Sequence, residues 1–441
     1  MNPENRNRYR VAIETHGCKL NQADSMTLAR EFSAAGFEIV DTADSFDAFV
    51  LNSCTVTSMA DRKARQALRS ARRRNPDATI VATGCYAQRS PEALTEISEI
   101  DIVLGNDDKA AVVERVAGSI GDAFQSLAGL DSIAAMTATR TRAMVKIQEG
   151  CNQVCAFCVV PRVRGREQSV APEAIVKDIL RFEALGFNEV VLTGTQLGSY
   201  GFDLPDNENL TTLVSRILES TSVPRVRVSS LQPQDIDNAF LDLWADQRLC
   251  PHFHLPLQSG SDAVLRRMRR RYDAKRFSGA VEAIRSRMAD AAITADVIVG
   301  FPGETESEFR ETVEICGRME FADLHGFPYS RRPGTSAARL DDHVSPELKA
   351  ARSQELLTQA ADMASEFRRS LLGTTRPVLW ESLRVSESQR TWTGLTDNYV
   401  RVRTVSAADL ANTIAPTRLD GLDGQEMVGE VASEASAISS P

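Results

Sequence analysis

Residues 149–162 read EGCNQVCAFCVVPR, a stretch that places Cys151, Cys155 and Cys158 in one short loop. An odd number of thiols does not suit a disulfide framework, and a structural zinc site needs four ligands. Thiolates are the usual ligands of iron–sulfur clusters, and three of them leave one iron of a [4Fe–4S] cluster open for a small molecule. The spacing therefore predicts an open cluster, with a zinc knuckle completed by a distant ligand as the alternative.

The chain after this stretch alternates between short apolar runs and helical patterns. The helical segments include 172–185, 261–287 and 304–319, and six runs are strand candidates: 143–148, 189–194, 225–230, 252–257, 293–300 and 322–330. Six βα units predict a barrel or partial barrel whose site lies at the carboxyl ends of the strands. The loop with the three cysteines follows the first of these strands, so it lies at that end.

A second set of cysteines precedes the barrel. Five strand candidates alternate with helical patterns and predict a small parallel sheet: 10–15, 37–40, 47–53, 79–84 and 100–105. Cys18, Cys54 and Cys85 each come just after a strand, and such positions share one edge of a parallel sheet. A lone cysteine is more often a small buried side chain, but three at equivalent positions predict a second metal site.

The remaining regions complete an α/β fold with three domains. A long helical pattern covers 344–371, and short alternating runs over 375–434 predict a small antiparallel β-barrel. The predicted domains are an N-terminal parallel sheet, a linker, a (β/α)6 partial barrel and the C-terminal β domain, over residues 9–120, 121–141, 142–372 and 373–435.

The composition of the 441 residues is that of a globular protein, with 42% hydrophobic residues and a net charge of −9. This charge argues against a general nucleic-acid binder, and the basic runs 62–74 and 266–276 are interpreted as solvated helix faces that leave an anionic partner open. We find no signal peptide and no apolar run near the roughly 18 residues that span a bilayer, so we expect a cytoplasmic protein without a membrane partner. Cys250 and Cys316 fit neither cysteine set and are expected in the core.

Eight motifs considered together resemble the radical S-adenosylmethionine (SAM) methylthiotransferase family over nearly all of residues 9–434: GCKLNQ, NSCTVT, TGCYAQ, CNQVCAFCVVPRVRGRE, LTGTQLGSYG, HLPLQSGSD, ADVIVGFPGETE and FPYSRRPGTSAA. The resemblance implies two [4Fe–4S] clusters. Cys151, Cys155 and Cys158 would hold the catalytic cluster that cleaves SAM, and Cys18, Cys54 and Cys85 an auxiliary one. It also implies that the C-terminal β domain is a TRAM domain, a small RNA-binding barrel.

The SAM contacts are expected at the strand ends. Gly194, Thr195 and Gln196 could meet the amino-acid end of SAM, although an ordinary tight turn explains them equally well. Gly300 could admit the adenine against the backbone. Gln258 is a further candidate contact, whereas His254, which points to the same side of the chain, is more often a core histidine.

By resemblance, one SAM methylates sulfur at the auxiliary cluster, and another gives a 5′-deoxyadenosyl radical that activates a substrate carbon. The motifs that flank the first three cysteines look most like the branch that modifies N6-threonylcarbamoyladenosine at C2, next to the anticodon of tRNA. The alternatives are isopentenyladenosine tRNA, a ribosomal-protein aspartate, or a non-catalytic iron–sulfur or zinc protein that binds RNA. A flavodoxin- or ferredoxin-type reductant is expected, and Gln232 stands where this branch suggests Glu.

Overall fold

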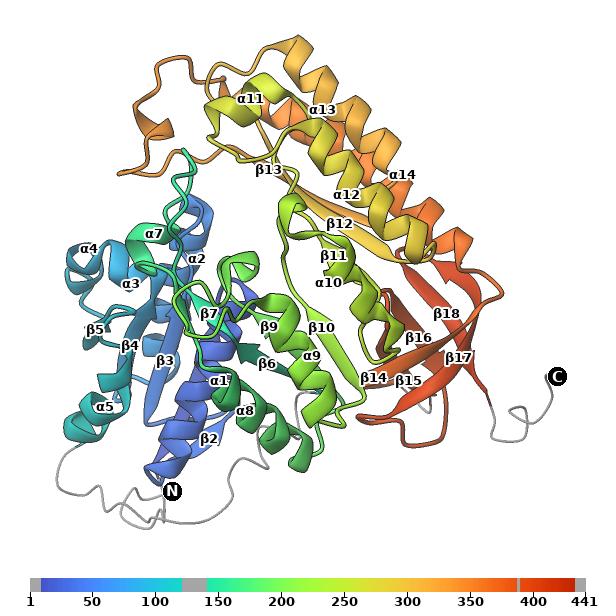
Figure 1. The fold of residues 1–441 in the computed structure, drawn as a ribbon. Coiled ribbons are helices and arrows are strands. Elements are labelled where there is room, and N and C mark those ends of the chain that lie inside the picture. Colours follow the sequence, from blue (N-terminus) through green and yellow to red (C-terminus); the bar gives the residue numbers. More distant parts are fainter. Residues whose placement is uncertain (1–8, 121–140, 387–388, 433–441) are drawn as a thin grey trace.

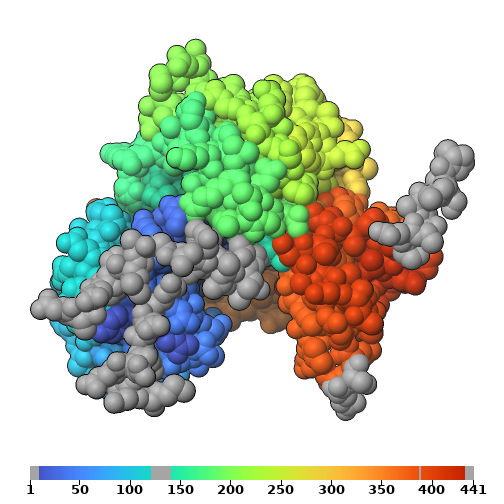
Figure 2. All heavy atoms as spheres, turned by 90° about the horizontal axis from the view of Figure 1, so that it is seen from below, coloured from blue at the N-terminus to red at the C-terminus, as the bar shows by residue number. Residues whose placement is uncertain are grey.

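A computed structural model describes residues 9–120, 141–386 and 389–432, so the predicted linker lies almost wholly outside the described residues. Figure 1 shows an N-terminal α/β lobe, a central α/β domain and a C-terminal barrel in chain order. Seen from below, the N-terminal lobe and the C-terminal barrel lie on opposite sides of a recess beneath the central domain (Figure 2). Within the described residues, no helix is both long and apolar enough to cross a membrane.

The N-terminal lobe contains the predicted parallel sheet. The strand order is β2-β1-β3-β4-β5, and every neighbouring pair is parallel: β1 (Arg10–Thr15), β2 (Glu38–Val40), β3 (Ala48–Ser53), β4 (Thr79–Gly84) and β5 (Ile102–Leu104). One face packs against α1 (Lys19–Ala34) and α5 (Val112–Ile120), and the other against α2 (Ser58–Arg74) and α4 (Pro91–Thr95). The short α3 (Cys85–Arg89) and a 3-10 turn (Lys109–Ala111) complete the lobe.

The central domain contains the six predicted parallel strands. They form two three-stranded sheets, β10-β9-β6 and β11-β12-β13, with β6 (Arg142–Lys146), β9 (Glu189–Thr193), β10 (Arg225–Val228), β11 (His252–His254), β12 (Ala292–Val299) and β13 (Asp323–Pro328). A parallel bridge between Ser230 and His254 joins the two sheets into a partial barrel. The fold class predicted from the sequence is confirmed.

Helices cover the outside of this barrel: α8 (Pro172–Ala184), α9 (Leu210–Ser220), α10 (Asn238–Asp242), α11 (Asp262–Arg267), α12 (Ala274–Arg287), α13 (Glu306–Met319) and α14 (Pro346–Ser370). Smaller elements are α7 (Val160–Val163) and the β7 (Gln148–Glu149) and β8 (Gln168–Ser169) pair, with 3-10 turns at 197–199, 233–235, 243–245 and 337–339. Helix α1 of the N-terminal lobe also packs on β6: Ala23 and Met26 join the barrel core, and the Met26 sulfur accepts a hydrogen bond from the Met144 amide at 3.4 Å.

The helical pattern over 261–287 was predicted as one segment, but the structure breaks it between α11 and α12. Arg269 adopts a left-handed backbone conformation with φ of 58°, and the Asp273 carboxylate caps α12 by accepting from the Arg276 amide. A capping aspartate favours a new helix start over continuation of the previous helix. The break turns Arg270 and Tyr272 toward the interior.

The C-terminal strands close into a barrel in the order β14-β15-β16-β18-β17. Its strands are β14 (Thr375–Ser386), β15 (Gln389–Thr396), β16 (Arg401–Val405), β17 (Ile414–Asp423) and β18 (Glu426–Val431), all paired antiparallel except β16 with β18. Trp380, Trp392 and Leu419 fill its core.

The C-terminal barrel docks on the amino ends of the central strands through buried arginines. Arg225 donates to the carbonyls of Pro377 and Leu395, and Arg227 donates to the carbonyl of Asp397 at 2.9 Å. Both guanidinium groups also contact Glu189, which is fully buried on β9. A buried carboxylate with two such partners keeps its charge, and the pKa of Glu189 is lowered to about 2 against the opposing effect of burial.

Candidate active site

The loop that contains Cys151, Cys155 and Cys158 leaves β7 through Gly150, whose φ is 74°. A side chain at residue 150 would lie 1.9 Å from the Arg166 carbonyl oxygen, so only glycine fits there. The Cys151 amide bonds to the Gly165 carbonyl, and the Ala156 amide to the Met268 carbonyl, which fixes both halves of the loop. The loop therefore lies at the carboxyl end of the barrel, where it was predicted.

Burial affects the ionisation of two thiols in this loop. Burial raises the pKa of Cys158 to about 12, and the charges of Cys155 and Cys151 contribute to the rise. The pKa of Cys151 is raised in the same way, mainly by burial. A coordinating metal deprotonates a thiol outright, so thiols that stay protonated at neutral pH become ligands only when a metal centre stabilises their thiolates.

Cys18, Cys54 and Cys85 follow β1, β3 and β4, at the shared edge that was predicted. Burial raises the pKa of Cys54 to about 12, and the charges of Cys85 and Cys18 contribute to the rise. Gly17 has φ of 127°, and a side chain there would lie 2.7 Å from the Cys54 Cβ atom. A glycine before Cys18 thus allows the β1 and β3 ends to approach.

The donor sets of the two cysteine triplets fit iron–sulfur clusters. A structural zinc site needs four ligands, whereas three thiolates can hold a [4Fe–4S] cluster with one open iron. The number of thiols in each triplet therefore suits such a cluster.

Arg164 connects the two triplets, and sequence reasoning did not single it out. Its guanidinium is buried, and it donates to the Cys85 sulfur at 3.4 Å and to the Asp24 carboxylate at 2.7 Å. It also donates to Glu149, two residues before Cys151. Val159 and Val163 of the same segment pack against Cys85. The segment that follows the first triplet is thus in direct contact with the second.

Arg270 performs a similar role for the first triplet. Its guanidinium donates to the Cys155 sulfur at 3.1 Å and to the side-chain oxygen of Gln232. It also contacts the Tyr272 hydroxyl. The basic run 266–276 is therefore not simply a solvated face, because the helix break directs one of its arginines onto a cysteine. Gln232, the residue that departs from the expected Glu, orients this arginine.

The predicted SAM contacts at the second strand end have protein partners. The amides of Thr195 and Gln196 both donate to the Gln148 side-chain oxygen at 2.9 Å. A side chain at Gly194 would lie 2.9 Å from the Gln148 carbonyl oxygen, so this glycine allows a close backbone approach. The turn is thus explained by Gln148, and SAM contacts there stay a prediction.

The other two predicted SAM contacts, Gln258 and Gly300, differ in whether the surrounding protein accounts for them. Gln258 has φ of 65°, and its buried side-chain oxygen has no partner within the described part of the chain, as expected of a group that awaits a ligand. Gly300 has φ of 70°, and its amide donates to Glu304. A side chain at Gly300 would meet Lys349 of α14, so the structure explains this glycine by helix packing. Both SAM contacts stay predictions.

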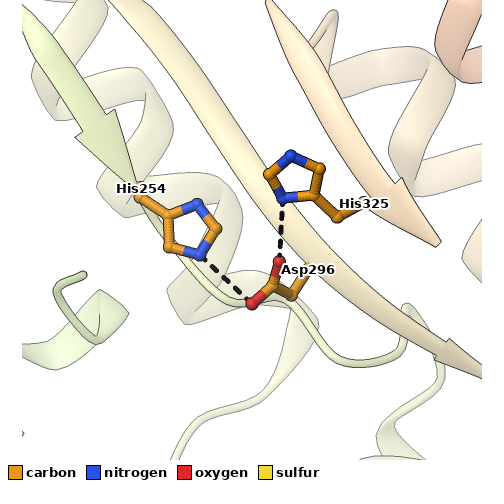
Figure 3. A group of neighbouring side chains, drawn as sticks. All are labelled: His254, Asp296 and His325. Atoms are coloured by element: carbon orange, nitrogen blue, oxygen red, sulfur yellow. Dashed lines mark hydrogen bonds and ion pairs between the residues drawn. The ribbon is translucent and has the colours of Figure 1, made fainter. Parts of the chain in front are cut away.

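Three polar side chains from adjacent strands meet inside the barrel (Figure 3). The Asp296 carboxylate on β12 contacts His254 on β11 and His325 on β13, each at 3.2 Å through a different oxygen. The second ring nitrogen of His254 lies 2.9 Å from the Thr294 hydroxyl, so His254 is a largely buried histidine with partners for both ring nitrogens, in line with the expected core histidine. The hydrogen bond with Asp296 raises the pKa of His325.

These three residues have the donor set of a divalent metal site, since one ligand atom from each lies within 4.8 Å of the others. However, Asp296 already uses one oxygen on each imidazole, and this pairing alone accounts for the geometry. We therefore describe the group as a hydrogen-bonded polar cluster inside the barrel.

Comparison with known proteins gives matches in the two regions that contain the cysteines. Residues 10–105 match the Uncharacterized protein family UPF0004, and residues 145–316 match the Radical SAM superfamily. The solved structure of the radical S-adenosylmethionine methyltransferase TsrM from Kitasatospora setae, with tryptophan and a SAM analog bound, has a TM-score of 0.55. It is 15% identical, over 80% of this chain and 89% of that one. This likeness supports the fold alone.

Two curated relatives cover nearly the whole chain. The threonylcarbamoyladenosine tRNA methylthiotransferase MtaB of Bacillus subtilis is 37% identical over 426 residues, which are 93% of each chain. The tRNA-2-methylthio-N(6)-dimethylallyladenosine synthase of Syntrophotalea carbinolica is 31% identical over 92% of this chain and 96% of the relative.

Fold, cysteine loop and superfamily match define a radical SAM enzyme. The chain belongs to the radical SAM methylthiotransferase family, as the motifs predicted. The alternative of a non-catalytic iron–sulfur or zinc protein is thereby set aside.

Proposed function

We propose that this enzyme adds a methylthio group to C2 of N6-threonylcarbamoyladenosine in tRNA, next to the anticodon, with two [4Fe–4S] clusters. The observation that carries the proposal is the contact of Arg164, from the segment after the first triplet, with Cys85 of the second. Two cofactors held this way would act on one substrate between them. The relative from Bacillus subtilis, named for threonylcarbamoyladenosine tRNA, supports the substrate.

The two cysteine triplets would hold clusters with different roles in the reaction. A cluster on Cys151, Cys155 and Cys158 would supply the electron that cleaves SAM, and one on Cys18, Cys54 and Cys85 the sulfur to be transferred. Arg270 donates to the Cys155 sulfur and holds this side chain in the cysteine loop. Arg164 donates to the Cys85 sulfur and, through Glu149, fixes the start of the cysteine loop relative to the N-terminal lobe.

A stripe of arginines on α2 supports an RNA substrate. Arg62, Arg65, Arg69 and Arg73 line one surface groove, opposite the face of α2 that packs on the sheet. Helix α2 begins beside the carboxyl end of the central barrel, since Asp61 in its first turn is paired with Arg332 at 2.7 Å. The stripe thus runs outward from the mouth of the site, where phosphates of a bound tRNA would meet it.

Replacing Arg62, Arg69 and Arg73 together by serine is expected to weaken tRNA binding by about 10-fold or more at moderate salt. Each lost phosphate contact should also reduce the slope of log Kd against log salt by roughly 0.7–0.9, because fewer counterions are released. Filter binding at several salt concentrations measures both effects. SAM cleavage without tRNA should stay unchanged.

The matched control replaces Arg287, Arg310 and Arg369 by serine. These arginines are already paired with Asp242, Glu355 and Glu366, so they offer less free charge to RNA. An equal loss of tRNA affinity in both triple variants would show that α2 has no particular role.

The substrate itself is tested with purified reconstituted enzyme, SAM and a low-potential reductant. Three substrates are compared: tRNA with threonylcarbamoyladenosine, tRNA with isopentenyladenosine, and the ribosomal protein. Mass spectrometry should find the methylthio group on the first. Preference for either of the others would overturn the substrate assignment while leaving the reaction class intact.

A further inference from the structure

Different kinds of side chain line the interior of the central barrel, from its mouth at the cysteine loop to its floor at the C-terminal barrel. Phe157 of the cysteine loop and Ile298 on β12 pack against the same apolar cluster, and Ile298 lies in register with Phe327 on β13. One step deeper, Asp296 is in register with His325. At the floor, Tyr399 of the C-terminal barrel stacks on His252 with the ring centroids 4.5 Å apart.

The β13 side chains His325 and Phe327 face this lumen. A side chain at the intervening Gly326 would meet Leu356 of α14, so the opposite face of the strand is covered by that helix. Side chains alternate along a strand, which directs His325 and Phe327 inward. Both are well exposed, with 51% and 44% of their surface accessible. An exposed aromatic ring and imidazole inside a barrel indicate room for a ligand.

Lys19 extends into the same lumen from the N-terminal lobe. Its ammonium nitrogen lies 5.6 Å from the centre of the Tyr399 ring, and its charge opposes the rise in the pKa of His325 that Asp296 causes. Lys19 makes no ion pair with any described residue. The neighbouring cations differ, because Arg142 is paired with Glu381 and Arg227 with Glu189, each at 2.7 Å.

A half-buried lysine without an acidic partner favours an anionic ligand, since an unpaired charge away from water is costly. Lys19 directly follows Cys18, so this cation is held by the same turn as a cysteine of the second triplet. An anion bound there would lie within the lumen and below the reacting end.

We infer that Lys19 is the residue that recognises the carboxylate of the threonylcarbamoyl group. The inference rests on the proposed function and adds the basis of its specificity. The threonylcarbamoyl substituent on N6 carries a carboxylate, whereas a dimethylallyl substituent is an uncharged hydrocarbon. C2 and C6 of adenine are the two neighbours of N1, so the N6 substituent lies on the same edge of the ring as C2. When C2 faces the cysteine loops, this substituent extends past Phe327 and toward Lys19.

The negative charge of Asp296 does not prevent a substrate carboxylate from binding at Lys19. Each of its oxygens is engaged by an imidazole, so its charge is directed to His254 and His325. Lys19 lies over the Tyr399 ring and has no ion pair with the residues that the structure describes, so its ammonium group can meet the substrate. Phe327 and Ile298 supply the apolar wall on which the base would rest.

The test compares N6-threonylcarbamoyladenosine with its methyl ester as inhibitors of tRNA methylthiolation by the reconstituted full-length enzyme. The wild-type enzyme should bind the free acid about 10- to 100-fold more tightly than the ester, the range of one charge-assisted hydrogen bond. Lys19→Met should bind both nucleosides equally, with affinity for the ester unchanged, while Lys19→Arg keeps the preference. Lys177→Met, an exposed lysine on α8, is the matched control and should behave as wild type.

The tRNA kinetics give a second readout. Lys19→Met should raise KM for tRNA more than it lowers kcat. Equal binding of acid and ester by the wild-type enzyme would overturn the inference even if Lys19→Met failed to fold or to hold iron. A wild type that modifies threonylcarbamoyladenosine without discriminating the ester refutes only the role of Lys19. A wild type that prefers isopentenyladenosine refutes the proposed function as well.

Discussion

Replacing Cys155 by alanine is expected to reduce the formation of 5′-deoxyadenosine from SAM to the background rate. Cys155 lies in the middle of the cysteine loop and receives a hydrogen bond from Arg270 at 3.1 Å. With two thiolates left, the loop would no longer hold a cluster with one open iron. Chromatography of the products after anaerobic reconstitution and reduction measures the effect, and iron analysis should show that roughly half of the iron remains, because the second triplet is intact.

Cys316→Ala provides the matched control for this experiment. Cys316 is buried on α13 among apolar side chains of the barrel core and lies outside both triplets. This variant should cleave SAM at the wild-type rate and keep its full iron content. Continued 5′-deoxyadenosine formation by Cys155→Ala at the normal rate would show that the loop does not hold the SAM-cleaving cluster.

Replacing Cys18, Cys54 and Cys85 together by alanine is expected to separate the two half-reactions. The variant should lose roughly half of its iron, still cleave SAM, and form no methylthio product, because the sulfur-carrying site is gone. The Cys151 amide keeps its backbone hydrogen bond to the Gly165 carbonyl in this variant. Iron analysis, 5′-deoxyadenosine assay and nucleoside mass spectrometry on one preparation test all three points.

A double variant of Cys250 and Cys316 controls for the general cost of removing buried thiols. Both are buried away from the triplets. Unchanged iron content in the triple variant, compared with this control, would contradict the assignment of a second cluster.

The strand ends were predictable from the sequence, because the period and length of apolar runs fix parallel strands and their carboxyl edges. Cys54 and Cys85 follow their strands directly, and Cys18 lies three residues after β1. Two triplets at two strand edges could therefore be inferred without a structure. Their roles as ligands stay predictions.

The partners of these cysteines could not be predicted, because they depend on how the lobes pack. Arg164 reaches Cys85 across 79 positions of sequence, and Arg270 reaches Cys155 across 115. Nothing in a helical pattern over 261–287 indicates that Arg270 points inward, since the break depends on the cap at Asp273 and the burial of Tyr272. The stacking of Tyr399 on His252 likewise depends on how the C-terminal barrel docks.

Removal of residues 375–441 is unsuitable as a test of RNA binding, because the C-terminal barrel docks on the central domain. The deletion would strip Arg225 and Arg227 of their carbonyl partners and expose Glu189 at the base of the central barrel. Unsatisfied buried charges of this kind destabilise a fold by several kcal/mol, so a loss of activity would report unfolding. Surface substitutions on α2 avoid this problem.

The same docking has a consequence for the exchange of parts between related enzymes. Arg225 and Arg227 hold the C-terminal barrel by main-chain oxygens, which every amino acid provides. A barrel of similar backbone could therefore keep these bonds whatever its sequence, but it would also need the side chains that cross the interface, namely Tyr399 on His252, Glu381 with Arg142, and Arg376 with Asp290. The position of such a transplanted barrel would depend on its backbone, and its fit to the central domain on these few side chains.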